Sequence, residues 1–299
     1  MEHIRTISLA LDVGERVELQ LENRSGAVSV RGEDTRQVAI EVTARLWAES
    51  EADADAQAEE IVRGILRDGH RIIIRAPALV WPGPFFFGRG PRIDYRITSP
   101  RATAAHINSR SGRVEVENIL GPLEVEARSG RVDTRGIGAD TTIVSRSGSV
   151  QAENIAGCLA IDSRSGGVQV RRCERDVAVH SRSGSLRVEH VGGSLRADCR
   201  SGSLAIAGVG GALTVRARSG SLRYEGPVQG PFDLELMSGS AILAVDRESR
   251  FYLDAETMSG SVRSDLPLHR GSAGGPSRGG AGPRVRVRTR SGSIRIVPR

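Results

Sequence analysis

Lysine is absent from the sequence, and aromatic residues are scarce. All 42 basic residues are arginines, they outnumber the 36 acidic residues, and the formal net charge is +6. Tryptophan, tyrosine and phenylalanine make up only 3% of the chain, so we expect a core of valine, isoleucine, leucine and alanine. The same scarcity disfavours binding of single-stranded nucleic acid through stacked bases, which needs exposed aromatic rings. The basic surface can still attract polyanions.

Long apolar runs and paired cysteines are also missing. No stretch reaches the roughly 18 apolar residues of a membrane-spanning helix, and the first residues lack the basic and apolar segments of a signal peptide. The three cysteines, Cys158, Cys173 and Cys199, show no C-x-x-C spacing, which favours a reducing compartment. The six histidines form no metal-binding pattern. We therefore expect a cytoplasmic protein without a membrane span, a metal site or a cofactor.

A Ser-Gly pair recurs along most of the chain. Further copies, at irregular spacing, begin at Ser25, Ser238, Ser259 and Ser291. The regular copies, each 18 residues after the last, begin at Ser111, Ser129, Ser147, Ser165, Ser183, Ser201 and Ser219. A fixed period of this length is typical of a repeat architecture. We number each repeat from its serine as position 1.

Within each repeat, apolar residues alternate with polar ones in two short segments. Positions 4 and 6 are Val114 and Val116 in one repeat and Leu186 and Val188 in another, and positions 13 and 15 follow the same pattern. Alternation with a period of two predicts strands with one buried face. Identical positions in every repeat allow the strands of successive repeats to stack in register. The sequence therefore predicts an all-β fold, a parallel β-solenoid of about 18-residue two-strand coils.

The remaining segments are assigned around this array. Residues 1–46 are expected to form N-terminal strands and a first coil, and residues 47–100 an inserted helix and hairpin that cap the array, because an open sheet edge pairs with other chains. The regular solenoid spans residues 101–269. Residues 270–283 are expected to form a flexible glycine-rich loop, and residues 284–299 a C-terminal strand pair that makes the last coil.

The inserted helix is predicted from about Glu51 to Arg67. Ser50 and Asp53 resemble a capping box at its start, and Gly69 is the predicted stop. The segments HRIIIRAP and RIDYRITSP then read as the strands of the hairpin, on either side of a Pro/Gly loop.

These repeats resemble a bacterial β-strand-repeat family labelled as adhesins, a domain of unknown function. The resemblance rests on units of the form S-G-x-V-x-V … G-x-L-x-V and on an upstream strand that ends in proline, here DYRITSP. It covers roughly residues 15–299. It implies a β-solenoid without an established enzymatic activity, and it supplies no catalytic residues.

An arginine precedes each regular Ser-Gly pair, and these residues are the candidate polyanion ridge: Arg110, Arg128, Arg146, Arg164, Arg182, Arg200 and Arg218. Stacked coils would place them about 4.8 Å apart along one edge, where neighbouring like charges repel by about 1 kcal/mol in water. Three interpretations remain open. The guanidinium groups cap turn carbonyls and cover apolar edges with their stems, acidic residues at position 16 such as Asp162 and Asp198 neutralise them, or an external polyanion binds them. Nucleic acid, anionic lipid and acidic polysaccharide all fit the last interpretation.

One apolar segment, WPGPFFFG, lies outside the repeats. Its residues Trp81, Phe85, Phe86 and Phe87 either fold over the solenoid or form a docking loop for a partner.

Taken together, these features predict a non-enzymatic β-solenoid scaffold or interaction protein. Its expected partners are a second copy of the chain, in a self-assembling homo-oligomer, or another protein. A polyanion-binding module is the main alternative. A carbohydrate-active β-helix enzyme is the other alternative, because the outward carboxylate pairs Glu115/Glu117 and Glu124/Glu126 have the chemistry of a glycosidase site.

Overall fold

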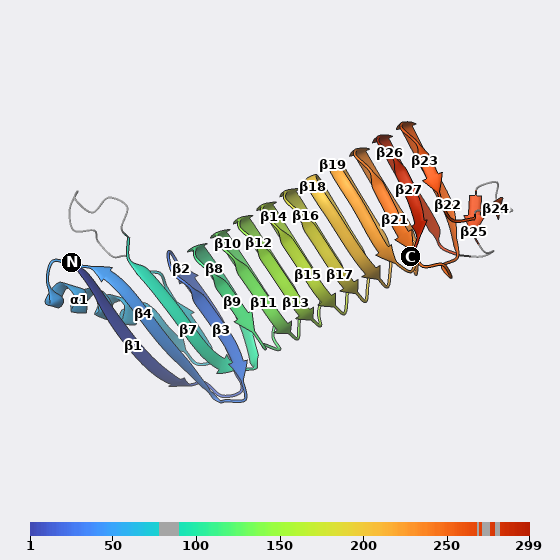
Figure 1. The fold of residues 1–299 in the computed structure, drawn as a ribbon. Coiled ribbons are helices and arrows are strands. Elements are labelled where there is room, and N and C mark those ends of the chain that lie inside the picture. The colour runs from blue at the N-terminus through green and yellow to red at the C-terminus, as the bar shows by residue number, and fades with distance from the viewer. Residues whose placement is uncertain (78–89, 268, 271–275, 279–281) are drawn as a thin grey trace. The chain divides into compact units, whose positions relative to one another are not determined.

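The computed structural model describes residues 1–77, 90–267, 269–270, 276–278 and 282–299. These residues divide into two compact units, residues 1–148 (unit 1) and residues 149–299 (unit 2), and both are built mainly of strands (Figure 1). In each unit the chain alternates between two sheets. We call the sheet whose repeat strands end at a Ser-Gly turn the pre-turn sheet, and the sheet whose repeat strands begin after such a turn the post-turn sheet. Strands outside the repeats are assigned to the sheet with which they pair.

The elements of unit 1 are β1 (Glu2–Asp12), β2 (Arg16–Asn23), β3 (Val28–Glu33), β4 (Gln37–Trp47), α1 (Glu51–Arg63), β5 (Ile65–Asp68), β6 (Arg71–Ile74), β7 (Arg92–Pro100), β8 (Ala102–Ser111), β9 (Val114–Glu117), β10 (Leu123–Ser129), β11 (Val132–Ile137) and β12 (Thr141–Ser147). The pre-turn sheet has the order β5–β6–β2–β8–β10–β12. The post-turn sheet has the order β1–β4–β7–β3–β9–β11.

Successive coils of unit 1 stack in parallel and in register. Val132 lies opposite Val114 in the post-turn sheet. The first coil, made of β2 and β3, pairs directly with β8 and β9, so that Leu19 lies opposite Ala105 and Val28 opposite Val114. Because matching apolar positions meet across the insertion, the predicted first coil around Ser25 is confirmed.

The insertion extends both sheets on the other side of the first coil. In the pre-turn sheet β6 pairs in parallel with β2, and in the post-turn sheet β7 pairs in parallel with β3. β4 and β1 then continue the post-turn sheet as antiparallel strands. The insertion does contain a hairpin, but it joins β5 to β6 instead of joining the two predicted strands, which lie in different sheets.

The helix α1 is about one turn shorter than predicted. The Ser50 hydroxyl accepts a hydrogen bond from the Asp53 amide at 3.1 Å and donates one to the Asp53 carboxylate at 2.8 Å, so the predicted capping pair is confirmed. The helix ends at Gly64 instead of Gly69, and the Gly64 carbonyl accepts a hydrogen bond from the Arg75 amide at 3.0 Å. Gly69 instead forms the β5–β6 turn with φ of +59°, a conformation that glycine adopts without strain.

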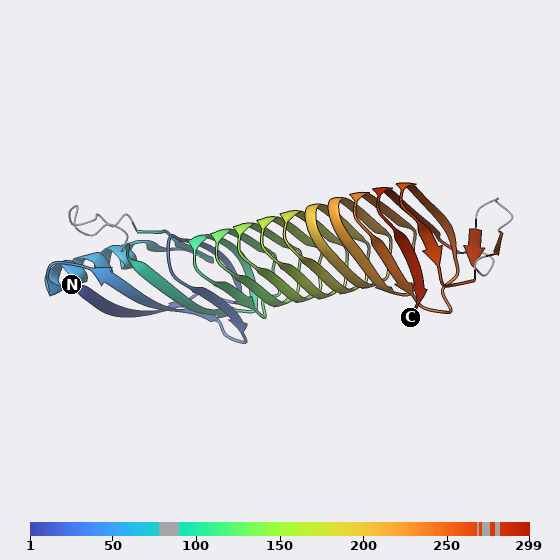
Figure 2. The ribbon, with the colours of Figure 1, turned by 45° about the horizontal axis from the view of Figure 1, so that its top comes forward.

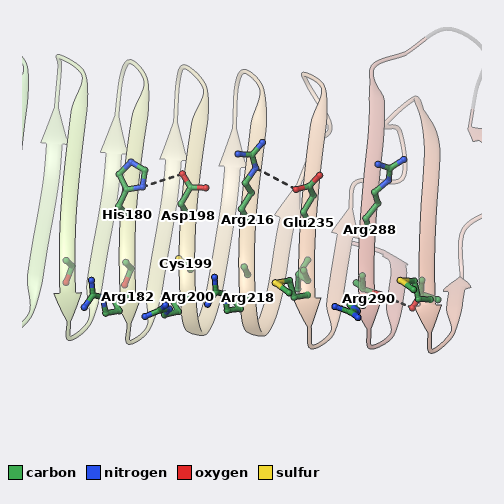
Figure 3. Close-up of a pocket in the computed structure, with 18 of the residues that line it drawn as sticks. His180, Arg182, Asp198, Cys199, Arg200, Arg216, Arg218, Glu235, Arg288 and Arg290 are labelled. Atoms are coloured by element: carbon green, nitrogen blue, oxygen red, sulfur yellow. Dashed lines mark hydrogen bonds and ion pairs between the residues drawn. The ribbon is translucent and has the colours of Figure 1, made fainter.

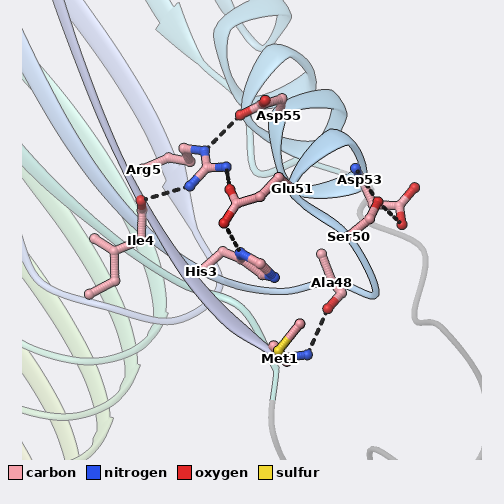
Figure 4. Close-up of polar contacts among 9 residues, drawn as sticks. All are labelled: Met1, His3, Ile4, Arg5, Ala48, Ser50, Glu51, Asp53 and Asp55. Atoms are coloured by element: carbon pink, nitrogen blue, oxygen red, sulfur yellow. Dashed lines mark hydrogen bonds and ion pairs between the residues drawn. The ribbon is translucent and has the colours of Figure 1, made fainter.

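The helix α1 contacts β1, β4 and β5, and buries Ala54 and Ile61. Arg5 of β1 forms ion pairs with Glu51 and with Asp55, the latter at 2.7 Å between Nε and Oδ1 (Figure 4). The Arg5 guanidinium lowers the pKa of Glu51. The described part of the chain contains no helix with enough apolar length to traverse a bilayer.

The elements of unit 2 are β13 (Val150–Ile155), β14 (Leu159–Ser165), β15 (Val168–Cys173), β16 (Val177–Ser183), β17 (Leu186–Val191), β18 (Leu195–Val209), β19 (Leu213–Gly226), β20 (Phe232–Ser238), β21 (Ala241–Val245), β22 (Phe251–Ser259), β23 (Val262–Ser264), β24 (His269–Arg270), β25 (Pro276–Arg278), β26 (Arg284–Ser291) and β27 (Ile294–Pro298). β18 and β19 each continue through a Ser-Gly turn and therefore belong to both sheets. The pre-turn sheet has the order β14–β16–β18–β19–β20–β26–β22. The post-turn sheet has the order β13–β15–β17–β18–β19–β21–β27–β23.

The core of unit 2 is a thin, mainly aliphatic layer between these two sheets, in which Tyr224, Phe232 and Phe251 are also buried. Leu186 and Val188 of the post-turn sheet and Leu195 and Ala197 of the pre-turn sheet are all buried, at the positions where the sequence alternates. Outward-facing residues between them are polar or charged. The parallel β-solenoid of two-strand coils predicted from the repeats is thus confirmed.

The last strand pair of the sequence is not the last coil of unit 2. β26 pairs on one side with β20 and on the other with β22, and β27 lies between β21 and β23 (Figures 1 and 2). The prediction of residues 284–299 as the last coil is therefore wrong. They form the coil before it, and β22 and β23 stack outside them.

Charge accounts for this order. Residues 284–299 contain six arginines and no acidic residue. Arg286 of β26 lies between Asp233 of β20 and Asp254 of β22, and Arg288 lies between two glutamates. Stacking β22 directly on β20 would place acidic side chains opposite each other, which destabilises a pair of strands. An arginine-rich coil between two acidic ones removes this repulsion.

The Ser-Gly turn is fixed by contacts between neighbouring coils. Gly184 has φ of +130°, and a Cβ atom there would overlap the carbonyl oxygen of Gly166 in the preceding coil. The serine hydroxyl links the same coils, because Ser183 Oγ donates a hydrogen bond to the Arg164 carbonyl at 3.3 Å and Ser201 Oγ to the Arg182 carbonyl at 3.3 Å. Serine and glycine therefore complete the turn without the arginine side chain.

Candidate anion-binding groove

A groove of about 1310 Å³ runs along the outer face of the pre-turn sheet of unit 2. Its two walls and its floor come from three consecutive residues of each coil, those directly before the Ser-Gly pair. Because successive outward side chains of a strand point to one face and the residue between them points inward, the first and third residues form the walls and the second forms the floor.

The wall next to the turn is the arginine row. In spatial order it consists of Arg164, Arg182, Arg200, Arg218, Met237, Arg290 and Met258. Each of these side chains is exposed, and its labelled members line up along the lower edge of the strands in Figure 3. Among the described residues, none of the five arginines of this row has a side-chain hydrogen bond or an ion pair with another residue.

The opposite wall is the paired row, in which acidic and basic side chains alternate along most of its length. In spatial order it consists of Asp162, His180, Asp198, Arg216, Glu235, Arg288 and Glu256. His180 Nδ1 lies 3.3 Å from Asp198 Oδ2, and Arg216 Nε lies 3.7 Å from Glu235 Oε2 (Figure 3). Asp198 also accepts a hydrogen bond from Arg196 at 3.0 Å. The contacts of these carboxylates therefore stay on their own side of the groove.

The floor of the groove is polar at both ends and less polar in the middle. Ser163 and Ser181 lie at one end, Cys199, Ala217 and Leu236 follow, and Thr289 and Thr257 lie at the other end. All of these residues except Thr257 are buried. Burial raises the pKa of the Cys199 thiol to about 11, with a further contribution from Asp198. The thiol is therefore protonated at neutral pH, where it is a poor nucleophile and a poor metal ligand.

These contacts bear on the three interpretations of the arginines. The Ser hydroxyls, not the guanidinium groups, bond the turn carbonyls. Asp198 has partners other than the arginine row, and Asp162 forms no ion pair with any other described residue. The positive charges of the five arginines of the row are therefore balanced neither by hydrogen bonds to turn carbonyls nor by ion pairs with the acidic residues at position 16.

Several arginines on the post-turn sheet of the same unit are paired with acidic residues. Arg187 Nε lies 2.5 Å from Glu189 Oε1, and Arg223 Nε lies 2.5 Å from Glu225 Oε1. The Arg187 guanidinium lowers the pKa of Glu189. Pairing two residues apart along one strand was thus available to the fold, and it occurs outside the groove.

The other sequence-predicted residues fall into separate places. Arg110, Arg128 and Arg146 occupy the equivalent position in unit 1 and are exposed. Glu124 accepts a hydrogen bond from His106 at 3.0 Å, and Glu126 one from Asn108 at 3.4 Å. The proposed docking residues Trp81, Phe85, Phe86 and Phe87 lie outside the described residues.

Sequence reasoning missed the two methionines of the row and the place of Arg290. Met237 and Met258 directly precede Ser238 and Ser259, so the signal was present at the irregularly spaced copies. The adjacency of Arg290 to both methionines depends on the inserted C-terminal coil. Within the described residues, no group of three His, Cys, Asp or Glu side chains is arranged to hold a metal ion.

Comparison with known proteins agrees with the repeat assignment. The family model of Toastrack DUF4097 matches residues 142–297, which is just over half of the chain. Among solved structures, the chain is similar to a "putative cell adhesion protein" from Clostridium sporogenes ATCC 15579, at 11% identity and a TM-score of 0.20, with 100% of this chain and 99% of that chain covered. A TM-score this low supports no statement about function. No curated protein matches the chain. The resemblance expected from the repeats is thereby confirmed, and the chain belongs to the Toastrack DUF4097 family.

Proposed function

We propose that unit 2 binds an extended anionic chain along its groove, without catalysing a reaction on it. The observation that carries this proposal is the row of five arginines without internal partners, beside a wall whose charges are largely paired. A linear site suits a polymer better than a compact ligand, because drug-sized ligands occupy about 300–1,000 Å³ and the groove has about 1310 Å³.

The unpaired row carries an energetic cost that a ligand would offset. Guanidinium groups about 4.8 Å apart repel each other by about 1 kcal/mol per neighbouring pair in water. Binding of an anionic chain replaces this repulsion by attraction and releases counterions, so affinity should fall steeply as salt is raised.

No observation favours a reaction in this groove. A glycosidase acid needs a carboxyl group with a raised pKa. The carboxyl groups of the described residues whose pKa is displaced are Glu51, Glu189 and Asp254. Arginine neighbours lower the pKa of each of them, and none of the three lines the groove. Self-assembly into a scaffold stays a prediction, because stacking within one chain accounts for the coils.

The test compares two double variants that remove the same charge from opposite faces of unit 2. Arg200→Gln with Arg218→Gln removes two arginines from the row, and Arg187→Gln with Arg223→Gln removes two from the post-turn sheet. Heparin serves as the anionic polymer, at salt concentrations from about 50 to 200 mM. Two exposed ion pairs contribute about 0.4–2 kcal/mol together, so the groove variant should bind heparin roughly 2- to 30-fold more weakly. The control variant should keep the parent affinity. Equal losses in both variants, or no loss in either, would refute the proposal.

A further inference from the structure

The arginine row is not uniform, and its last part has two exposed methionines. Met237 is 49% exposed and Met258 is 81% exposed, whereas apolar side chains of this size are usually buried in a solenoid core. They flank Arg290, because β26 lies between β20 and β22. The floor beside them is mixed, because Leu236 adjoins Met237 whereas Thr289 and Thr257 adjoin Arg290 and Met258. The two methionines and Leu236 therefore add apolar surface to a cationic end of the groove.

A ligand that is only charged and hydrophilic does not match this end. A sulfated or carboxylated polysaccharide, or a phosphate backbone, would pair with the arginines and leave both methionines in water. A flat lipid surface does not follow the floor of a groove. An acidic peptide with apolar side chains offers carboxylates for the arginines and apolar groups for the methionines, whose flexible thioethers adapt to varied partners.

The spacing of the coils also fits a peptide. Every second coil is about 9.6 Å away, since coils repeat at about 4.8 Å. A polyproline II chain rises about 3.1 Å per residue with three residues per turn, so every third residue recurs on one face at about 9.3 Å. Acidic residues at every third position would therefore face alternate coils, and apolar residues at every third position would recur at the separation of Met237 and Met258.

From these observations we infer that the ligand of the groove is an acidic peptide segment in an extended, polyproline-II-like conformation, with acidic and apolar residues each recurring every third position. The inference rests on the proposed function and names the class of its ligand. The groove extends from the coil of Arg164 to the coil of Met258, about 29 Å at 4.8 Å per coil. About nine residues at 3.1 Å each span this length.

The test uses three nine-residue peptides on the full chain. The first repeats Glu-Pro-Leu three times and has the inferred pattern. The second repeats Glu-Pro-Ser and keeps only the charge, and the third has the composition of the first with its glutamates at adjacent positions. Burial of leucine against the methionines should make the first peptide bind about tenfold more tightly than the second, and the third should bind more weakly than the first.

Protein variants separate this inference from the proposed function. Met237→Gln with Met258→Gln should reduce binding of Glu-Pro-Leu to the level of Glu-Pro-Ser, about tenfold, and should weaken heparin binding by a much smaller factor. Val262→Thr, at an exposed apolar residue of β23 in the same coil as Met258, is the matched control and should change neither.

The outcomes are distinguishable. If the two peptides bind equally, if the methionine variant keeps the preference, or if heparin or single-stranded DNA binds more tightly than Glu-Pro-Leu, the peptide assignment is overturned. The proposed function still stands in those cases, provided that Arg200→Gln with Arg218→Gln weakens binding. If that variant weakens the binding of neither the peptides nor heparin, both are overturned.

Discussion

Replacement of Gly184 by alanine should destabilise unit 2 strongly. Its φ of +130° lies in a region that residues with a Cβ atom occupy only at a cost of about 1–3 kcal/mol. The new methyl group would also overlap the carbonyl oxygen of Gly166, and relieving such an overlap by moving one coil costs a further 1–3 kcal/mol or so. The sum is about 2–6 kcal/mol, a large part of the 5–15 kcal/mol that typically separates a folded domain from its unfolded state.

The matched control is Gly167, which follows Gly166 in the turn of the preceding coil. Its φ lies outside the left-handed region, and a Cβ atom there would approach only the Ser185 hydroxyl, at 3.3 Å. Because a hydroxyl can rotate away, alanine should fit. A glycine-to-alanine change at a compatible position stabilises by about 0.4–1 kcal/mol, since it restricts the unfolded chain.

The two variants can be compared by urea denaturation followed by far-ultraviolet circular dichroism. Solenoids can unfold in parts, so hydrogen exchange should locate the effect. Gly184→Ala should lower the urea midpoint and speed amide exchange in β16 and β18, whereas Gly167→Ala should not lower the midpoint. Equal midpoints for the two variants would show that neither the backbone angle nor the contact between coils constrains the turn.

Two further variants test backbone strain and charge in unit 2. Arg172 is exposed and has φ of +56°. Arg172→Gly should therefore stabilise unit 2 by up to about 1 kcal/mol, whereas Arg172→Val should destabilise it. Equal urea midpoints for the two variants would contradict this. Arg284 lowers the pKa of Asp254, with a further contribution from Arg286. The ionised carboxylate therefore stabilises the fold at pH values above its unfolded pKa of about 3.9. This stabilisation is lost as the pH falls through the lower pKa that Asp254 has in the folded state. Asp254→Asn should therefore lower the melting temperature at pH 7 but have little effect near pH 2, and an equal loss at both values would rule out the ion pair as the cause.

The coils could be predicted from the sequence because their determinants are local. Val114, Leu186 and their equivalents repeat at one position, and a period of two has one structural meaning when it recurs in register. The bend at position 8 has a weaker signal. It is formed by a residue with positive φ, and in five regular coils this residue is asparagine or glycine, which adopt such angles readily: Asn118, Gly136, Asn154, Gly208 and Gly226. In two coils it is Arg172 or His190, so composition marks the bend only in part.

The candidate site could be predicted only in part. The sequence shows that an arginine precedes most turns, because the period aligns Arg164, Arg182 and Arg200. It does not show that these arginines lack partners. Asp198 is two residues away from both Arg196 and Arg200 in the sequence, but in the structure it contacts Arg196. Which of two equidistant arginines a carboxylate contacts depends on the direction of its side chain.

The order of the coils is the part that periodicity cannot determine. Every coil presents similar backbone donors and acceptors, so hydrogen bonds alone allow β22 or β26 to stack on β20. The difference lies in the side chains, because Asp233 repels Asp254 but attracts Arg286.

The same order of coils shapes the candidate site. Direct stacking of β22 on β20 would bring Met237 beside Met258 without a charge between them, whereas insertion of β26 places Arg290 between the two methionines. The charge pattern that orders the coils is therefore also what makes one end of the groove both cationic and apolar.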